Sequence, residues 1–130
     1  MINGRKWRIL FAEDDSLLAD TVDDMLREEG FCVDHSPDGV AALERAAEHP
    51  FDVLLTDLRM PRLDGSALIR ALRAENPGLP VVVCSGYAPP EWLMNLQREG
   101  EGPLVMLAKP MRMRVLLDAL RKVLGAPPSP

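Results

Sequence analysis

Short apolar runs recur along the chain, and each is followed by a stretch with helical spacing. Residues 53–56 (VLLT) and 80–84 (PVVVC) are the clearest of these runs. Runs this apolar are typical of strands that are buried on both faces, as in a parallel sheet. Because parallel neighbours need a crossover between them, the intervening stretches favour helices that cover both faces of the sheet.

The alternation predicts five strand–helix units. The expected strands are residues 8–12, 31–35, 52–56, 80–84 and 104–108. The expected helices are residues 16–28, 38–48, about 65–75, a short helix that opens at Pro89 and ends near Gly100, and 112–124. Right-handed crossovers restrict such units to a doubly wound α/β fold, and we expect the flavodoxin-like strand order 2-1-3-4-5. We expect one domain over residues 1–125 and a Pro-rich tail or linker over 126–130.

The bulk composition excludes several functional classes. The 130 residues carry a formal net charge of −5, so the chain as a whole offers no basic surface for direct nucleic-acid binding. No apolar stretch approaches the roughly 20 residues that span a bilayer, and the first residues lack the apolar core of a signal peptide. Cys32 and Cys84 have no metal-ligand spacing and are expected to be reduced and buried in strands. We therefore expect a cytoplasmic protein that does not insert into a membrane.

Acidic residues follow two of the predicted strands. Glu13, Asp14 and Asp15 come after the first strand, and Asp57 comes after the third. In the expected strand order these two strands are neighbours, and open α/β sheets bind ligands outside the carboxyl ends of their strands. Glu13, Asp14 and Asp57 should therefore meet at one edge, where their mutual repulsion calls for a cation and their oxygens suit Mg²⁺. We expect Asp15 to cap the following helix instead.

Further polar residues end strands at the same edge of the sheet. Ser85 and Gly86 follow the fourth strand, and Lys109 follows the fifth. A lysine opposite a bound Mg²⁺ is suited to holding a phosphoryl group. Asp57 lies beside both, which is the setting of a carboxylate nucleophile that forms an acyl phosphate.

Together these segments resemble the receiver domain of bacterial two-component response regulators, of the chemotaxis-regulator type. The resemblance extends from about Trp7 to Leu124 and rests on four pieces in this order: ILFAEDD, VLLTDLRMPRLDG, VVVCSGYA and LAKPM. It implies a phosphorelay domain in which Asp57 accepts a phosphoryl group from a phosphohistidine of a histidine kinase or a histidine phosphotransfer domain. It also implies self-catalysed phosphorylation and autodephosphorylation without turnover of a separate substrate, and it leaves a phosphorylation-dependent dimer open.

The resemblance implies a cation site at the acidic edge. Mg²⁺, or Mn²⁺ in its place, would take direct ligands from Asp14, Asp57 and the backbone carbonyl of Arg59. Glu13 would bind the same ion more loosely, through water.

The resemblance also implies roles around the phosphoryl group. Ser85 would hydrogen-bond a phosphoryl oxygen, and Gly86 would keep the approach to the site open. Lys109 would pair with the phosphoryl charge, and the Lys109–Pro110 bond is often cis in this family.

One position departs from the family pattern. Family members usually carry Tyr or Phe three residues before the lysine, as a rotating switch residue, whereas this chain has Met106 there. We therefore expect output to rely on displacement of the helix that opens at Pro89. The departure keeps open a degenerate receiver that acts only as a protein-docking module.

Two other functions are less compatible with the residues. An Asp-nucleophile phosphohydrolase would want a second Asp two residues after the nucleophile, where this chain has Arg59. A flavin or nucleotide binder would want a Gly-rich or Ser/Thr-rich phosphate loop after the first strand, where acidic residues stand. His35 and His49 have no evident ligand partners and are expected at the surface. The sequence leaves open whether the chain is a stand-alone regulator or part of a larger protein, and which kinase serves it.

Overall fold

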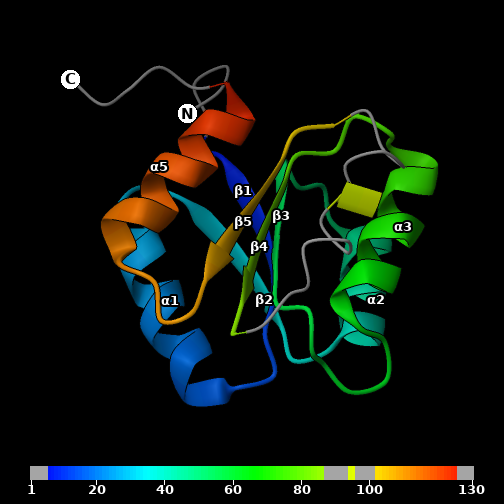
Figure 1. Cartoon of the computed structure of the whole chain (residues 1–130), viewed down its shortest axis with the longest axis horizontal. Helices are drawn as coiled ribbons and strands as arrows, with labels where there is room; N and C mark the ends of the chain where they lie inside the picture. The colour runs from blue at the N-terminus through cyan, green and yellow to red at the C-terminus, as the bar shows by residue number, and fades with distance from the viewer. Residues whose placement is uncertain (1–5, 87–93, 96–101, 126–130) are drawn as a thin grey trace.

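Five parallel strands form the sheet at the centre of the molecule, in the order β2-β1-β3-β4-β5 (Figure 1). The computed structural model describes residues 6–86, 94–95 and 102–125. The strands are β1 (Arg8–Ala12), β2 (Cys32–Ser36), β3 (Val53–Thr56), β4 (Val81–Ser85) and β5 (Leu104–Ala108). Each neighbouring pair runs parallel. The predicted α/β class and strand order are confirmed.

Helices cover both faces of this sheet. In the described part of the chain they are α1 (Ser16–Glu28), α2 (Gly39–Glu48), α3 (Gly65–Glu75) and α5 (Met113–Leu124). Figure 1 shows α1 and α5 on one side of the sheet and α2 and α3 on the other. The helix predicted to open at Pro89, and with it the expected displacement, lies outside the described residues apart from positions 94 and 95. None of the described helices combines the length and the apolar character that crossing a membrane requires.

The sheet separates two hydrophobic cores, because successive residues of a strand point to opposite faces. From β1, Ile9 and Phe11 join the core that α1 and α5 cover, whereas Leu10 joins the core that α2 and α3 cover. In β3, Leu55 and Leu54 divide in the same way. A one-residue slip of either strand would exchange these two sets of side chains between cores of different shape. Burial on both faces therefore holds the register, and with it the residues that follow each strand.

The second strand differs from its prediction by one residue. It runs over Cys32–Ser36 rather than residues 31–35, because its pairing with β1 starts at Arg8↔Cys32 and ends at Ala12↔Ser36. Cys32 is exposed, so the expectation that it is buried was wrong: it begins β2, which forms an edge of the sheet in the described part of the chain. Cys84 is buried as expected, and burial raises the pKa of its thiol to about 12.

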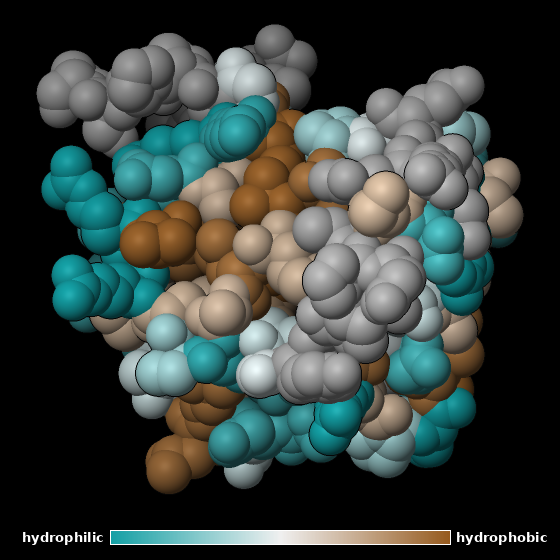
Figure 2. All heavy atoms as spheres, viewed as in Figure 1, coloured by the Kyte–Doolittle hydropathy of each residue, from teal (hydrophilic) through white to brown (hydrophobic). Residues whose placement is uncertain are grey.

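The other edge of the sheet is formed by β5. Its residues Leu104–Leu107 are half-buried rather than buried, in contrast to the fully buried β4. Figure 2 shows hydrophobic side chains gathered on this face of the molecule over α5 and β5. Val115 of α5 is a large hydrophobic residue with 44% of its surface exposed. This edge is therefore the more apolar part of the surface in this view.

Aspartate side chains cap three of the helices. Asp15 accepts hydrogen bonds from the backbone N–H groups of Leu17 and Leu18 at 3.1 and 3.2 Å, which confirms its predicted role as a cap. Asp38 caps α2 through the N–H of Ala41, which is why that helix begins one residue later than predicted. Such caps satisfy backbone donors that have no partner within the helix.

The cap of α3 is Asp64, which lies at the end of the loop that follows the candidate site. Its Oδ1 accepts hydrogen bonds from the N–H of Ala67 at 2.9 Å and from the hydroxyl of Ser66 at 2.8 Å. These hydrogen bonds, chiefly the one from Ala67, hold the pKa of Asp64 below its ordinary value. The charged carboxylate therefore stabilises the start of α3.

Replacing Asp64 by alanine is expected to lower the free energy of unfolding by about 1 kcal/mol near neutral pH. Because its pKa is lower in the folded chain than in the unfolded one, this stabilisation is fully present above the ordinary value of 3.8 and is lost as the pH falls through the lowered folded value. The difference in stability between wild type and Asp64→Ala, measured by urea unfolding, should narrow in acid. Asp64→Asn, an uncharged cap, should retain most of the stability near neutral pH. Equal stabilities of wild type and Asp64→Ala near neutral pH would contradict this role.

Candidate functional site

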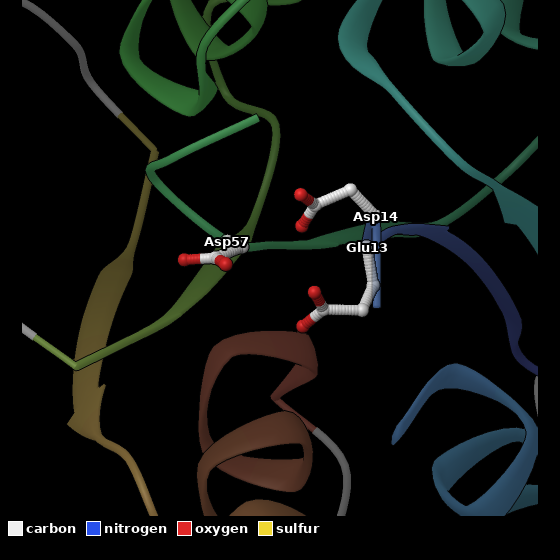
Figure 3. A group of neighbouring side chains, drawn as sticks. All are labelled: Glu13, Asp14 and Asp57. Atoms are coloured by element: carbon white, nitrogen blue, oxygen red, sulfur yellow. The ribbon is translucent and has the colours of Figure 1, made fainter. Parts of the chain in front are cut away.

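Three carboxylates meet at the carboxyl ends of β1 and β3. Each of Glu13, Asp14 and Asp57 offers an oxygen that lies within 4.8 Å of those from the other two. Figure 3 shows Glu13 and Asp14 at the end of β1 and Asp57 across from them at the end of β3. The pairing of Ala12 with Thr56 brings the strand ends together, and the N–H of Asp57 donates to the carbonyl of Ala12 at 3.1 Å. The predicted convergence of these acids is what the structure shows.

Lys109 completes this cluster from the end of β5. Its Nζ lies 2.6 Å from Oε1 of Glu13 and 3.1 Å from Oδ2 of Asp57. The backbone N–H of Lys109 donates to the carbonyl of Ser85 at 2.9 Å, which continues the pairing of β4 with β5 beyond the strands. The Lys109–Pro110 peptide bond is cis. The ammonium group thus bridges acids from two different strands.

Burial and charge oppose each other at Glu13 and Lys109. Only 3% of the Glu13 side chain is exposed, and this burial raises the pKa of its carboxyl group, although hydrogen bonds from Lys109 and from the N–H of Asp15 oppose the rise. Burial alone would lower the pKa of Lys109, but its hydrogen bonds to Glu13 and Asp57 raise it above the ordinary value. Lys109 therefore stays protonated in this site.

The backbone holds one oxygen of Asp57 in place. Oδ1 accepts a hydrogen bond from the N–H of Leu58 at 2.7 Å, while Oδ2 faces Lys109. The N–H of Arg59 lies farther from Oδ1, at 3.4 Å. The hydroxyl of Thr56 donates to the carbonyl of Asp57 at 2.8 Å. The half-buried carboxylate is therefore oriented before any ligand arrives.

Gly65 allows the first turn of α3 to pack directly on the main chain of the site. Its N–H donates to the carbonyl of Leu58 at 2.9 Å. A Cβ atom at position 65 would lie 2.1 Å from the carbonyl oxygen of Asp57 and 2.9 Å from Cα of Leu58. Since these are backbone atoms, any larger residue would displace the segment that carries Asp57.

The remaining predicted residues lie around this cluster at different depths. Ser85 is buried at the end of β4, and Gly86 is exposed directly after it. A Cβ at Gly86 would meet no atom within 4 Å in the described part of the protein. The described residues therefore leave space at this position. That the glycine keeps this space open for a phosphoryl group stays a prediction. Arg59 is exposed, and Met106 is half-buried against the core beside α2 and α3.

The sequence did not reveal the position of His35. It is half-buried, not a surface residue as expected, and its Nε2 lies 2.8 Å from the carbonyl oxygen of Glu13. His49 is exposed, as expected. The signal that could have found His35 is the strand order: with β2 beside β1, the residue at the end of the second strand lies next to the acids after the first.

The donor set is suited to a small divalent cation. Carboxylate oxygens are hard ligands of the kind that Mg²⁺ and Mn²⁺ prefer. Three carboxylates and one ammonium group leave an excess of two negative charges when all are ionised. A divalent cation would balance that excess, so the residues present fit such an ion.

Comparison with known proteins gives a consistent picture. The family model described as the response regulator receiver domain matches residues 9–121. The response regulator receiver protein CpdR of Brucella abortus is 34% identical over 119 residues, which cover 92% of this chain and 98% of that protein. The transcriptional regulatory protein ZraR of Escherichia coli is 33% identical over 117 residues, which cover 90% of this chain but only 26% of ZraR. The chain thus spans nearly all of one relative and about a quarter of the other.

Solved structures share the same fold. A CheY-like receiver domain protein from Methanospirillum hungatei superposes with a TM-score of 0.83 at 26% identity, covering 92% of this chain and 94% of that one. The receiver domain of the hybrid histidine kinase CckA superposes with a TM-score of 0.75 at 30% identity, covering 90% of this chain and 98% of that one. The chain belongs to the response regulator receiver domain family. Its role is that of a phosphoacceptor signalling domain in a two-component system.

The close packing at Gly65 predicts a sensitive position. Gly65→Ala should lower the free energy of unfolding by about 1–3 kcal/mol, because the added methyl group must push against backbone atoms. It should also weaken Mg²⁺ binding, because the displaced segment carries Asp57. Urea unfolding and calorimetric titration with Mg²⁺ measure the two effects. Gly78→Ala is the matched control, since the nearest heavy atom to its Cβ would be 4.0 Å away; similar losses in both variants would refute the packing argument.

Proposed function

We propose that Asp57 is the phosphoacceptor of this domain. A carboxylate oxygen of Asp57 attacks the phosphorus of a phosphohistidine, the P–N bond breaks, and the imidazole of the donor leaves as an acyl phosphate forms on Asp57. The observation that carries this proposal is the placement of Asp57, between the acids at the end of β1 and the ammonium group of Lys109. Hydrolysis of the acyl phosphate by water would return Asp57 to its carboxylate.

Lys109 and Ser85 are proposed to bind the transferred group. Lys109 already lies 3.1 Å from Oδ2 of Asp57, so its ammonium group needs little movement to contact a phosphoryl oxygen there. Ser85 ends the strand next to β3 and would donate its hydroxyl to another phosphoryl oxygen. Gly86 would leave room for that group. Met106, on the next strand, stands where the family usually has its aromatic switch residue, so output would rely on displacement of the helix that opens at Pro89.

The acidic cluster is proposed to bind Mg²⁺ or Mn²⁺. Asp14, Asp57 and the backbone carbonyl of Arg59 would be direct ligands, and Glu13 would bind more loosely. The bound ion would offset the negative charge that the carboxylates and the phosphoryl group bring together. Lys109, bonded to Glu13 and Asp57, neutralises part of that charge in the absence of the phosphoryl group.

The partners and extent of the domain are also proposals. The phosphoryl donor would be a histidine kinase or a histidine phosphotransfer domain, and phosphorylation would favour a dimer. Residues 1–125 would form the receiver and 126–130 a tail or linker, acting in the cytoplasm. CckA, a hybrid histidine kinase by its name, and ZraR, a transcriptional regulatory protein, represent two contexts in which related domains occur.

Incubation with acetyl phosphate and Mg²⁺ should add the mass of one phosphoryl group to the intact chain. Asp57→Asn should abolish the gain, because an amide is not a nucleophile of this kind. Asp118→Asn, which changes an exposed acid on α5, is the control and should be phosphorylated normally. If the wild-type chain binds Mg²⁺ but gains no mass, the domain acts only in protein docking. Steady release of phosphate from an added phosphoester would instead indicate a phosphohydrolase.

Lys109 should affect cation binding and phosphorylation in opposite directions. Its ammonium group bonds two of the carboxylates that would face the cation, so the two positive charges compete for the same oxygens. In Lys109→Met we expect Mg²⁺ affinity to be equal or higher, whereas phosphorylation at saturating Mg²⁺ should slow by about a hundredfold. Calorimetric titration and a time course of intact mass separate the effects. Lys122→Met, at an exposed site on α5, should change neither; a parallel fall of both in Lys109→Met would contradict the competition.

A further inference from the structure

Among the described residues, Glu13 makes four hydrogen bonds, two through its carboxylate oxygens and two through its main chain. Its carboxylate oxygens accept hydrogen bonds from Lys109 at 2.6 Å and from the N–H of Asp15 at 3.2 Å. Its backbone N–H donates to the carbonyl of Ser36 at 3.0 Å, and its backbone carbonyl lies 2.8 Å from Nε2 of His35. Both main-chain contacts come from the end of β2. The end of β2 therefore fixes the main chain from which the acidic cluster projects.

The two contacts from β2 differ in kind. Ser36 uses its backbone carbonyl, which any residue at that position would supply. His35 uses its side chain, so this contact depends on the identity of the residue. Because a carbonyl oxygen can only accept, the Nε2 atom of His35 must carry the hydrogen. His35 thus contributes a specific donor to the loop that follows β1.

The sheet holds the ring of His35 in position for this contact. His35 is paired with Phe11 in the parallel register of β1 and β2. The two rings lie 5.5 Å apart between centroids and are tilted by 50°. Since Phe11 is buried in the core beside α1 and α5, the imidazole rests on a fixed neighbour. A half-buried ring packed in this way can hold the carbonyl of Glu13 without a large loss of its own freedom.

We infer that His35 is a positioning residue for the cation site of this domain. It fixes the main chain of Glu13, and through it the direction in which Glu13 and the adjacent Asp14 face Asp57. The inference rests on the proposed function, since it assumes that these acids bind Mg²⁺. His35 itself does not touch the ion or the phosphoryl group. Residues that orient metal ligands in this way typically change metal affinity by about 10–100-fold when they are replaced.

Calorimetric titration with Mg²⁺ tests the role of His35. His35→Phe keeps a ring against Phe11 and removes the donor, so we expect Mg²⁺ to bind about tenfold more weakly. His35→Gln returns an N–H donor at a similar reach and should recover most of the affinity. His49→Gln, at the exposed histidine, should bind like wild type. Phosphorylation of His35→Phe by acetyl phosphate should reach the wild-type rate at saturating Mg²⁺, because the defect lies in ion binding alone.

Some results would overturn the inference. Wild-type Mg²⁺ affinity in His35→Phe would do so, as would a His35→Gln variant as weak as His35→Phe. A lower phosphorylation rate in His35→Phe that saturating Mg²⁺ does not restore would indicate a general structural defect and would also overturn it. If the wild-type chain itself bound no Mg²⁺, the proposed cation site would fail, and the inference with it. If wild type and His35→Phe bound Mg²⁺ equally well, the proposed cation site would stand and only the role of His35 would be refuted.

A measurement on the unmodified chain keeps the inference testable if His35→Phe does not fold. Long-range ¹H–¹⁵N correlation spectra at about pH 8, where an ordinary imidazole is neutral, report which ring nitrogen carries the hydrogen. We expect the hydrogen on Nε2 of His35, both without and with Mg²⁺. A hydrogen on Nδ1 would rule out donation from Nε2 to the carbonyl of Glu13 and would refute the inference.

Discussion

Parallel pairing of β1 with β3 is the constraint on which the rest of the site depends. Ala12 and Thr56 are partners at the ends of these strands, so the residues that follow them must share one edge of the sheet. That places the three carboxylates within 4.8 Å of one another, an arrangement that is unfavourable unless positive charge lies close by. The site is thus a consequence of strand order, and its charge favours nearby positive charge, part of which Lys109 supplies.

Lys109 supplies positive charge to this acidic site. It contacts Glu13 and Asp57 at once, so it keeps the acids together when no phosphoryl group is bound. The same ammonium group would be available to a phosphoryl oxygen if Asp57 is the phosphoacceptor, as we propose. Close packing beneath the site limits how far the acids can move, since Gly65 brings α3 against the main chain of Asp57. A change in charge at Asp57 would therefore act first on Lys109, whose Nζ lies 3.1 Å from Oδ2 of Asp57.

Much of the fold was predictable because both faces of the sheet are buried. Strands such as Val53–Thr56 are then apolar throughout and stand out from the helices between them. The errors are mostly shifts of one residue: β2 and β4 each lie one residue later than predicted, and β3 begins one residue later. At the edge of the sheet, Cys32 is also exposed rather than buried. An edge strand has only one neighbour, so hydrogen bonding to β1 decides its ends, and a pattern of apolar residues along β2 alone cannot locate them.

The sequence by itself determined the class of fold and the strand order, because the alternation of apolar runs and helical stretches is recognisable. It also determined the acids and the lysine of the site, because these residues come directly after recognisable strands. Only the tertiary structure decided which atoms meet. The contact of His35 with the carbonyl of Glu13 joins residues 22 positions apart, and the contact of Lys109 with Glu13 joins residues 96 apart. Such contacts depend on the register between strands and on side-chain packing. Register is a property of pairs of segments, so no single stretch of this chain could specify these contacts.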